Sequence, residues 1–329
     1  MIFDRFLDAW NGPDSPRRLR TRGIARLGVV ELRGAIPLID PHPRRIRGLE
    51  FDPAHRVAVM AVVNRTPDSF HDRGATFALD AAVSAALRAV KAGADWVDIG
   101  GVPFGRGPAV GEQEELDRVI PVVEAVVAAS PAVVSVDTTN AIVAEAAIRA
   151  GAGVINDTSG YWDERMPSVV ARSDATIVLT HSLHPPRSEP VEPVYADVVE
   201  DVRTHLARLV ERSRAAGIDA DRIIVDPGHD LNKNTLHSLE LIRRLPEIVA
   251  LGYPTLVALS NKDFIGETLD RPRGERVIGS VAGVVACVLA GARVVRVHDV
   301  AETVDAVRMA EAIMGLRPPA RIWHNAGQN

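Results

Sequence analysis

The sequence predicts an α/β protein of the (β/α)8 TIM-barrel class with an N-terminal extension. From residue 57 onward, short β-branched runs alternate with longer Ala/Leu-rich amphipathic stretches. The short runs, such as AVVSV and TLVAL, are almost continuously apolar, which is typical of parallel strands buried on both faces. About eight such units, spread over roughly 260 residues, match the length and alternation of this barrel.

A doubly wound open sheet is the alternative architecture. That fold usually carries a glycine-rich phosphate loop directly after its first strand. No such loop follows the first predicted strand at residues 57–63. The barrel is therefore the preferred fold.

The predicted strands and helices alternate along the chain. Strands are expected at residues 57–63, 96–100, 132–137, 153–157, 176–181, 222–226, 255–260 and 293–298. Helices are expected at residues 79–92, 112–129, 140–150, 164–172, 193–216, 236–250, 274–290 and 301–314. Glycine follows three of these helices directly, in AGAD at 92–95, AGAG at 150–153 and AGAR at 290–293. Each glycine then leads into a strand, as a glycine that caps a helix C-terminus does.

The predicted domain organisation has three segments: a basic N-terminal extension (1–46), the barrel (47–316) and a C-terminal tail (317–329). The extension is rich in arginine and begins with MIFDRFLDAW, whose apolar residues share one face of a helix. We expect this helix to dock on its own barrel or on a dimer mate; contact with a membrane surface or another protein is the alternative. Residues 47–56 are expected to form a short hairpin that plugs the bottom of the barrel.

Composition argues against several functional classes. The 329 residues carry a net charge of −5, which disfavours a general nucleic-acid binder. No apolar run reaches the roughly 18 residues of a membrane span, and Asp4, Arg5 and Asp8 interrupt any signal-peptide core. We therefore expect a soluble cytoplasmic protein. The single cysteine, Cys287, rules out an internal disulfide framework, and its apolar surroundings predict a buried structural thiol.

Polar side chains stand at or near the end of every predicted strand. These residues are Asn64, Asp98, Asp137, Asn156, Asp157, His181, Asp226, Ser260, Asn261, Lys262, Arg296, His298 and Asp299. Taken singly, each has a structural explanation, since Asn and Asp cap helices and shape turns and a histidine can be a satisfied core residue. Taken together, they converge on the C-terminal mouth of the barrel, where this fold builds its active sites. The pattern favours a polar-lined pocket.

The mixture of side chains limits the ligand. Carboxylates and amides at strand ends suit a heterocycle that has both hydrogen-bond donors and acceptors. Lys262, Arg296 and His298 suit an anion such as phosphate or pyrophosphate. Asn64 and the hydroxyl groups after it are placed to orient a metal–phosphate group. No His/Cys/Asp cluster has zinc spacing, so the expected metal is Mg²⁺ held mainly through the ligand.

Seven motifs occur in order, each at a strand end: NRTPDSFHDRG, VDIGG, SVDTTN, INDTSG, VDPGHDLNKN, ALSNKDFIG and RVHDV. In these motifs the sequence resembles the dihydropteroate synthase family, a family of pterin-binding (β/α)8 barrels. The resemblance covers roughly residues 47–316. It implies a transferase that joins 6-hydroxymethyl-7,8-dihydropterin pyrophosphate to p-aminobenzoate and releases pyrophosphate, a step of folate biosynthesis. It also implies a homodimer.

The resemblance implies a role for each matching position. The pterin-ring set would be Asp137, Asn156, Asp226 and Lys262, with Arg296 packed over the ring and Asp98 supporting the site. Pyrophosphate and Mg²⁺ would be bound by Asn64, Arg296 and His298. Ser260 and the helix after strand seven would face the aminobenzoate carboxylate. Mg²⁺, His298 and Arg296 would stabilise the charge that develops on the leaving oxygen.

The positions that would meet the second substrate depart from the family pattern. From Gly100 the chain reads GGVPFGRGPAV, where the family has Gly-Gly-Glu-Ser-Thr-Arg-Pro-Gly. Asn261 stands in SNK where the family has arginine. In HDLNKN, Leu231 replaces an aromatic residue and Asp230 adds a negative charge. Arg65 replaces a small apolar residue in the first loop.

Three functions compete on this basis. The first is a dihydropteroate synthase, which the full set of pterin positions favours. The second is a paralogue that binds a pterin without this activity or uses another amine, which the altered loops favour. The third is a pterin-dependent methyltransferase. The TPDSF loop and the RVHD strand end argue against the third, because a methyl donor needs no pyrophosphate clamp.

Overall fold

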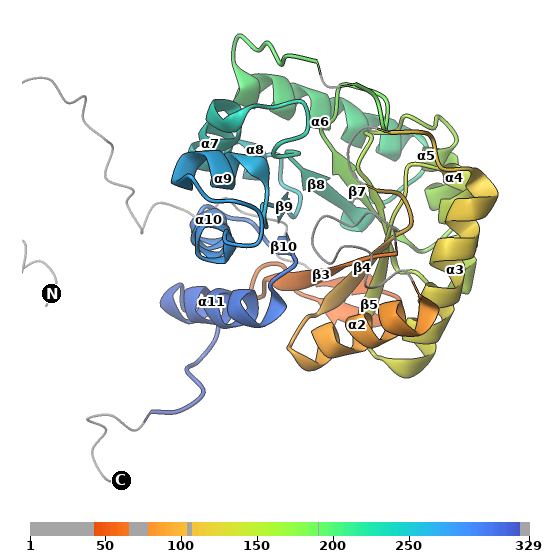
Figure 1. Cartoon of the computed structure of the whole chain (residues 1–329), viewed down its shortest axis with the longest axis horizontal. Helices are drawn as coiled ribbons and strands as arrows, with labels where there is room; N and C mark the ends of the chain where they lie inside the picture. Colours follow the sequence, from red (N-terminus) through yellow and green to blue (C-terminus); the bar gives the residue numbers. More distant parts are fainter. Residues whose placement is uncertain (1–42, 66–77, 104–106, 190, 323–329) are drawn as a thin grey trace, which may run out of the picture. The chain divides into compact units, whose positions relative to one another are not determined.

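The computed structural model describes residues 43–65, 78–103, 107–189 and 191–322. Eight strands form one sheet in the order β8-β7-β6-β5-β4-β3-β10-β9, and every pair of neighbours is parallel. A parallel bridge between Val225 of β8 and Thr255 closes the sheet into a barrel, and Val225 N donates to Pro254 O at 3.0 Å. The strands lie inside a ring of helices (Figure 1). The predicted (β/α)8 barrel is confirmed.

All eight predicted strands are present. They are β3 (Ala58–Asn64), β4 (Trp96–Gly100), β5 (Val133–Asp137), β6 (Val154–Asp157), β7 (Thr176–Thr180), β8 (Ile223–Asp226), β9 (Leu256–Ala258) and β10 (Val294–Val297). Most of their residues are buried, because helices cover the outer face and the barrel interior covers the inner face. The nearly continuous apolar runs are explained by this double burial.

The helices follow the prediction with two differences. They are α2 (Leu79–Lys91), α3 (Glu112–Ala129), α4 (Ala141–Ala150), α5 (Met166–Ala171), α6 (Val198–Ala215), α7 (Thr235–Arg243), α8 (Leu245–Val249), α9 (Asp263–Leu269), α10 (Val277–Leu289) and α11 (Val300–Ile313). The prediction of a single helix at 236–250 is wrong. Two helices, α7 and α8, are separated at Arg244, because Pro246 lacks the N–H that would continue the first helix. Helix α9 was not predicted, since its seven residues are too short for a clear period.

A hairpin of β1 (Arg44–Ile46) and β2 (Leu49–Phe51) packs into the bottom of the barrel. Ile46 and Phe51 belong to an inner core with the first inward-facing residues of the strands, and Phe51 meets Trp96 edge to face at 5.2 Å. The expected plug is therefore present, but its bounds differ from the predicted 47–56: β1 lies wholly within the segment assigned to the extension, and β2 ends at Phe51. The helix expected at the start of that extension lies outside the described residues.

Two buried arginines hold the hairpin in place. Arg44 is 3% exposed and its Nη1 donates to the carbonyl oxygens of Asp221 and Ile223, both at 2.9 Å. Arg293 is 1% exposed and its Nε donates to Pro53 O at 2.8 Å. Because both cations lose hydration in the core, these carbonyl contacts offset the cost of their burial.

Cys287 is fully buried, which confirms the predicted buried thiol, and burial raises its pKa to about 12. Among the described helices, none combines the length and the apolar character needed to cross a membrane.

The inner core gives a stability prediction. Phe51→Ala removes the ring that fills the barrel bottom, so we expect the free energy of unfolding to fall by about 3–4 kcal/mol in urea unfolding. Leu49→Ala, at a 40% exposed position of the same hairpin, is the matched control and should cost less than about 1 kcal/mol. Equal losses for the two variants would contradict the plug.

Candidate active site at the barrel mouth

The inward-facing residues of four neighbouring strands meet at the mouth. Asn64 of β3 pairs with Gly100 of β4, which pairs with Asp137 of β5. Asp137 in turn pairs with Asn156 of β6. A Cβ atom on Gly100 would come within 3.2 Å of Asn64 Oδ1 and 3.7 Å of the Asp137 Cβ. The glycine therefore leaves open the space between two polar side chains.

Arg296 connects the two carboxylates of this wall. Its Nε donates to Asp98 Oδ2 at 2.5 Å, and its Nη2 donates to Asp137 Oδ2 at 2.8 Å. Asp98 is fully buried and also accepts from Ser135 Oγ at 2.5 Å and from Asn156 Nδ2 at 3.1 Å. Burial lowers the pKa of Arg296, but the negative charges of Asp98 and Asp137 raise it by more. The pKa of Arg296 therefore lies above its ordinary value. The network therefore fixes a permanent cation across the mouth.

Asp226 and Lys262 form the opposite wall. Asp226 Oδ1 accepts from Gly228 N at 2.7 Å, and Lys262 Nζ donates to the carbonyl oxygen of His229. Gly228 has φ +66°, and a Cβ atom there would lie 2.3 Å from the His181 carbonyl oxygen, so only glycine fits this turn. Burial raises the pKa of Asp226 and lowers that of Lys262. Both side chains are thus fixed by contacts with the loop after β8.

Ser260 and His298 meet between these walls. Ser260 Oγ accepts from His298 N at 3.2 Å and lies 3.3 Å from His298 Nδ1. The structure thus brings the nine predicted site residues to strand ends on one side of the barrel. Ser260 contacts His298 there, while its predicted contact with a substrate carboxylate stays a prediction.

A chain of contacts from Lys233 through His181 to Asp201 supports the loop after β8. Sequence reasoning did not assign a role to this chain of contacts. Lys233 Nζ lies 2.8 Å from His181 Nδ1 and donates to the carbonyl oxygens of Gly228 (2.9 Å) and Leu231 (2.8 Å). His181 Nε2 lies 3.2 Å from Asp201 Oδ1. Burial lowers the pKa of Lys233 to about 7, and burial together with Lys233 lowers that of His181 to about 2. His181 is therefore neutral, and Lys233 anchors the loop from below.

Two arginines that follow strands β3 and β7 donate hydrogen bonds to neighbouring segments near the mouth. Arg65 Nη1 donates to the carbonyl oxygens of Asp117 and Arg118 in α3, both at 2.9 Å. Arg187, after β7, donates to Pro103 O at 2.5 Å and to Pro108 O at 3.1 Å. The divergent loop after β4 is thus joined to the loop after β7. The TPDSF loop falls within residues 66–77, and 104–106 fall in the second loop; both lie outside the described residues.

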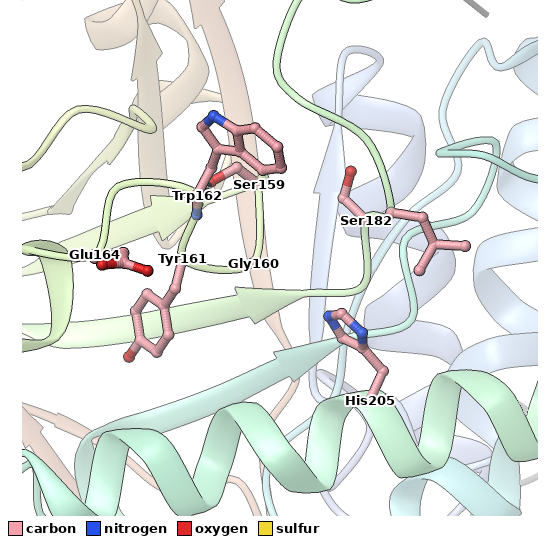
Figure 2. Close-up of a pocket in the computed structure, with 8 residues that line it drawn as sticks. Ser159, Gly160, Tyr161, Trp162, Glu164, Ser182 and His205 are labelled. Carbon is pink, nitrogen blue, oxygen red and sulfur yellow. Dashed lines mark hydrogen bonds between the residues drawn. The ribbon is translucent and has the colours of Figure 1, made fainter. Parts of the chain in front are cut away.

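A cavity of about 540 Å³ opens beside the mouth, between the loops after β6 and β7. Trp162 and Glu164 line one side, and Ser182 and His205 line the other (Figure 2). None of the nine predicted site residues lines it. The predicted site residues therefore lie outside this cavity.

Glu115 of α3 is a buried carboxyl group that sequence reasoning missed. It is 4% exposed, is hydrogen-bonded to Thr138, and leaves its Oε1 without a hydrogen-bond partner among the described residues. Burial raises the pKa of Glu115 to about 7, although the hydrogen bond with Thr138 lowers it. Its place on an otherwise apolar helix face is the one signal that could have identified it.

This carboxyl group predicts a pH dependence of stability. Because the folded pKa of Glu115 lies above its unfolded value of 4.5, the unfolded state loses this proton first as the pH rises. The free energy of unfolding should therefore fall between pH 4.5 and 7, by on the order of 3 kcal/mol from this group. Glu115→Gln should remove that part of the slope in urea unfolding. Glu114→Gln, at the exposed neighbouring position, should retain it; identical slopes for both variants would refute the assignment.

Comparison with known proteins agrees with this geometry. Residues 60–298 match the family model described as pterin binding enzyme. The chain is 44% identical over 272 residues to "Inactive dihydropteroate synthase 2" of Mycobacterium tuberculosis (81% of this chain, 86% of that one). It is 37% identical over 255 residues to dihydropteroate synthase of Haemophilus influenzae (77% and 93%). A crystal structure of Yersinia pestis dihydropteroate synthase with a sulfonamide drug complex superimposes with a TM-score of 0.80 at 38% identity, covering 83% of this chain and 100% of that one. The chain belongs to the dihydropteroate synthase family of pterin-binding enzymes.

Proposed function

We propose that the protein is a dihydropteroate synthase-type transferase that takes 6-hydroxymethyl-7,8-dihydropterin pyrophosphate at the barrel mouth. The pterin methylene would pass to an amine, with p-aminobenzoate as the first candidate, and pyrophosphate would leave. One observation carries the proposal: the Asp98–Arg296–Asp137 network faces Asp226 and Lys262 across one mouth.

The mouth has the groups that a pterin ring needs. Such a ring presents N–H donors along one edge and nitrogen and carbonyl acceptors along another. Asp226 offers an acceptor and Lys262 a donor. Asn156 Oδ1 is buried without a hydrogen-bond partner among the described residues, and a ring N–H would satisfy it. The Asn156 amide is already oriented, because its Nδ2 donates to Asp98.

The pyrophosphate would lie toward Asn64, Arg296 and His298. Arg296 would stabilise the charge that develops on the leaving oxygen, and its fixed position means that no reorganisation is needed. Asn64 Oδ1 is an oxygen ligand of the type that Mg²⁺ accepts, and it borders the space left by Gly100. Among the described residues no cluster of three His, Cys, Asp or Glu could hold a metal ion. Mg²⁺ would therefore be held mainly by the pyrophosphate and would neutralise it.

A pterin-binding protein without activity on p-aminobenzoate is the second candidate. Asn261 has φ +63° and its Oδ1 accepts from Gly274 N at 3.3 Å, so the position shapes a turn and supplies no cation. Several relatives that are 44% identical carry the name "Inactive dihydropteroate synthase 2". Both observations favour a changed acceptor half.

We also propose a cytoplasmic homodimer, on the family resemblance. Light scattering after gel filtration tests the dimer, and a single-chain mass would exclude it.

The deciding experiment mixes purified protein with the dihydropterin pyrophosphate, Mg²⁺ and p-aminobenzoate, and follows pyrophosphate and dihydropteroate by mass. Product at ordinary enzyme rates supports the first candidate. Tight pterin binding without product supports the second. Asp226→Ala is the control, and binding that survives this change would place the pterin elsewhere.

Asn64 gives a prediction that separates the two halves of the donor substrate. Asn64→Ala removes an oxygen that faces the phosphate side, so we expect magnesium pyrophosphate to bind about tenfold more weakly. Binding of the pterin without pyrophosphate should change less than about twofold. Calorimetry on both ligands measures this, and an equal loss for the two would exclude the assigned role.

A further inference from the structure

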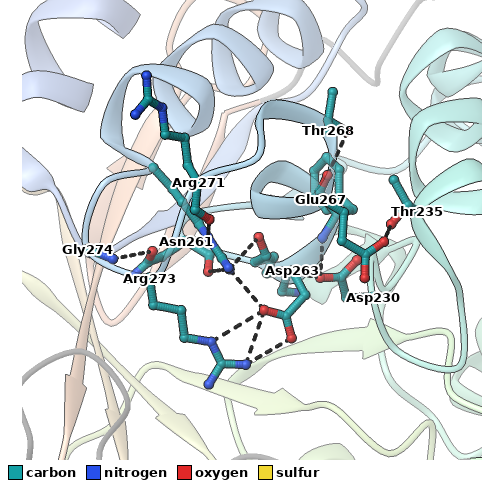
Figure 3. Close-up of polar contacts among 12 residues, drawn as sticks. Asp230, Thr235, Asn261, Asp263, Glu267, Thr268, Arg271, Arg273 and Gly274 are labelled. Carbon is teal, nitrogen blue, oxygen red and sulfur yellow. Dashed lines mark hydrogen bonds and ion pairs between the residues drawn. The ribbon is translucent and has the colours of Figure 1, made fainter.

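The loop after β8 carries a carboxylate that is fixed in place. Asp230 N donates to Ser238 Oγ at 3.2 Å, and Ser238 Oγ donates to Asp230 Oδ1 at 3.1 Å. Asp230 Oδ2 accepts from Asp263 N at 2.8 Å and from Phe264 N at 3.3 Å (Figure 3). The side chain is therefore anchored to α7 on one side and to the first turn of α9 on the other.

Every donor to this carboxylate is electrically neutral. The donors are one hydroxyl group and two backbone N–H groups, so no direct ion pair neutralises Asp230 among the described contacts. The nearby cations make their direct contacts elsewhere. Arg273 and Arg276 bind Asp263, at 2.8 and 2.9 Å. Lys262 and Lys233 interact with Asp230 electrostatically, but they donate to backbone carbonyl oxygens. Figure 3 shows Arg273 directed at Asp263 and not at Asp230. Asp230 is half-buried, so solvent screens its charge only partly.

This charge lies next to the proposed reaction site. Lys262 directly precedes Asp263, and its Nζ donates to the carbonyl oxygen of His229, the residue before Asp230. Asp230 also acts on Lys262 electrostatically, since it raises the pKa of that lysine against the larger lowering effect of burial. A second substrate that enters beside Lys262 therefore meets the fixed negative charge of Asp230 next to the positive charge of that lysine. A carboxylate on that substrate would face like-charge repulsion, and the two N–H groups of α9 are already used by Asp230.

We propose that Asp230 determines the acceptor and that this mouth takes an uncharged amine in preference to a carboxylate-bearing one. The inference rests on the proposed function, because it assumes that an amine reacts beside Lys262. It replaces p-aminobenzoate, the first candidate above, with a neutral aromatic amine as the preferred acceptor.

The test compares p-aminobenzoate with p-aminobenzamide, which has the same shape and no charge. Protein loaded with the dihydropterin pyrophosphate and Mg²⁺ is titrated with each amine by calorimetry, whether or not turnover follows. We expect the wild-type protein to bind the benzamide about tenfold more tightly than the benzoate. Asp230→Asn should bring the ratio of the two dissociation constants close to one.

The Asn variant isolates the charge. An Asn Oδ1 can still accept from the two N–H groups of α9, and Asn tolerates the φ of +62° at this position. Glu267→Gln is the matched control: it removes one negative charge from α9, which Asp230 contacts, at an exposed position, and the ratio should stay at its wild-type value.

Three outcomes overturn the proposal: a wild-type preference for the benzoate, an unchanged ratio in Asp230→Asn, or no binding of either amine to the loaded protein. Failure of the proposed function is distinguishable, since there the dihydropterin pyrophosphate itself fails to bind or binds equally well to Asp226→Ala.

Discussion

The Arg296 guanidinium, shared by Asp98 and Asp137, is the interaction on which the mouth depends. It joins β10 to β4 and β5 across the barrel, so it links strands that are not all neighbours. Asp98 is fully buried, and a buried carboxylate without a cation and hydrogen-bond donors would cost several kcal/mol. Ser135, Asn156 and Arg296 satisfy it together. The same network that makes this burial possible therefore orients the Asn156 amide and fixes a positive charge at the mouth.

The other wall is stabilised in a different way. Asp226 is positioned by its own turn, in which Gly228 allows the chain to pass close to the backbone of His181. Lys233 then ties the carbonyl groups of that turn to a neutral His181. The turn that positions Asp226 therefore depends on Lys233, a residue of the same loop beyond Gly228.

The sequence revealed the barrel and its strand ends because burial on both faces leaves apolar runs that stop abruptly at the mouth. It could not reveal which polar side chains meet. Asn156 and Asp157 are adjacent and equally polar, yet successive strand residues face opposite sides. Asn156 enters the barrel, whereas Asp157 accepts from Ser159 N and Tyr161 N at 2.9 Å and shapes a turn. Ser135 was hidden inside an apolar run, and the short α9 had no period to detect. Which side chains of two strands lie side by side depends on the register between the strands, and the sequence of one strand alone does not determine that register.

The departures from the family pattern are connected in the structure. Asn261 replaces a cation with a turn former, and its carbonyl oxygen accepts from Arg276 at 3.1 Å. Arg276 also binds Asp263, and the backbone of Asp263 binds Asp230. One chain of hydrogen bonds and ion pairs therefore runs from the loop after β9 to the loop after β8. Loops can change in this way while the barrel stays constant, because each loop belongs to a separate βα unit. The substituted loop positions therefore form one connected set of contacts, whereas the buried Asp98 makes its contacts within the barrel strands, with Ser135, Asn156 and Arg296.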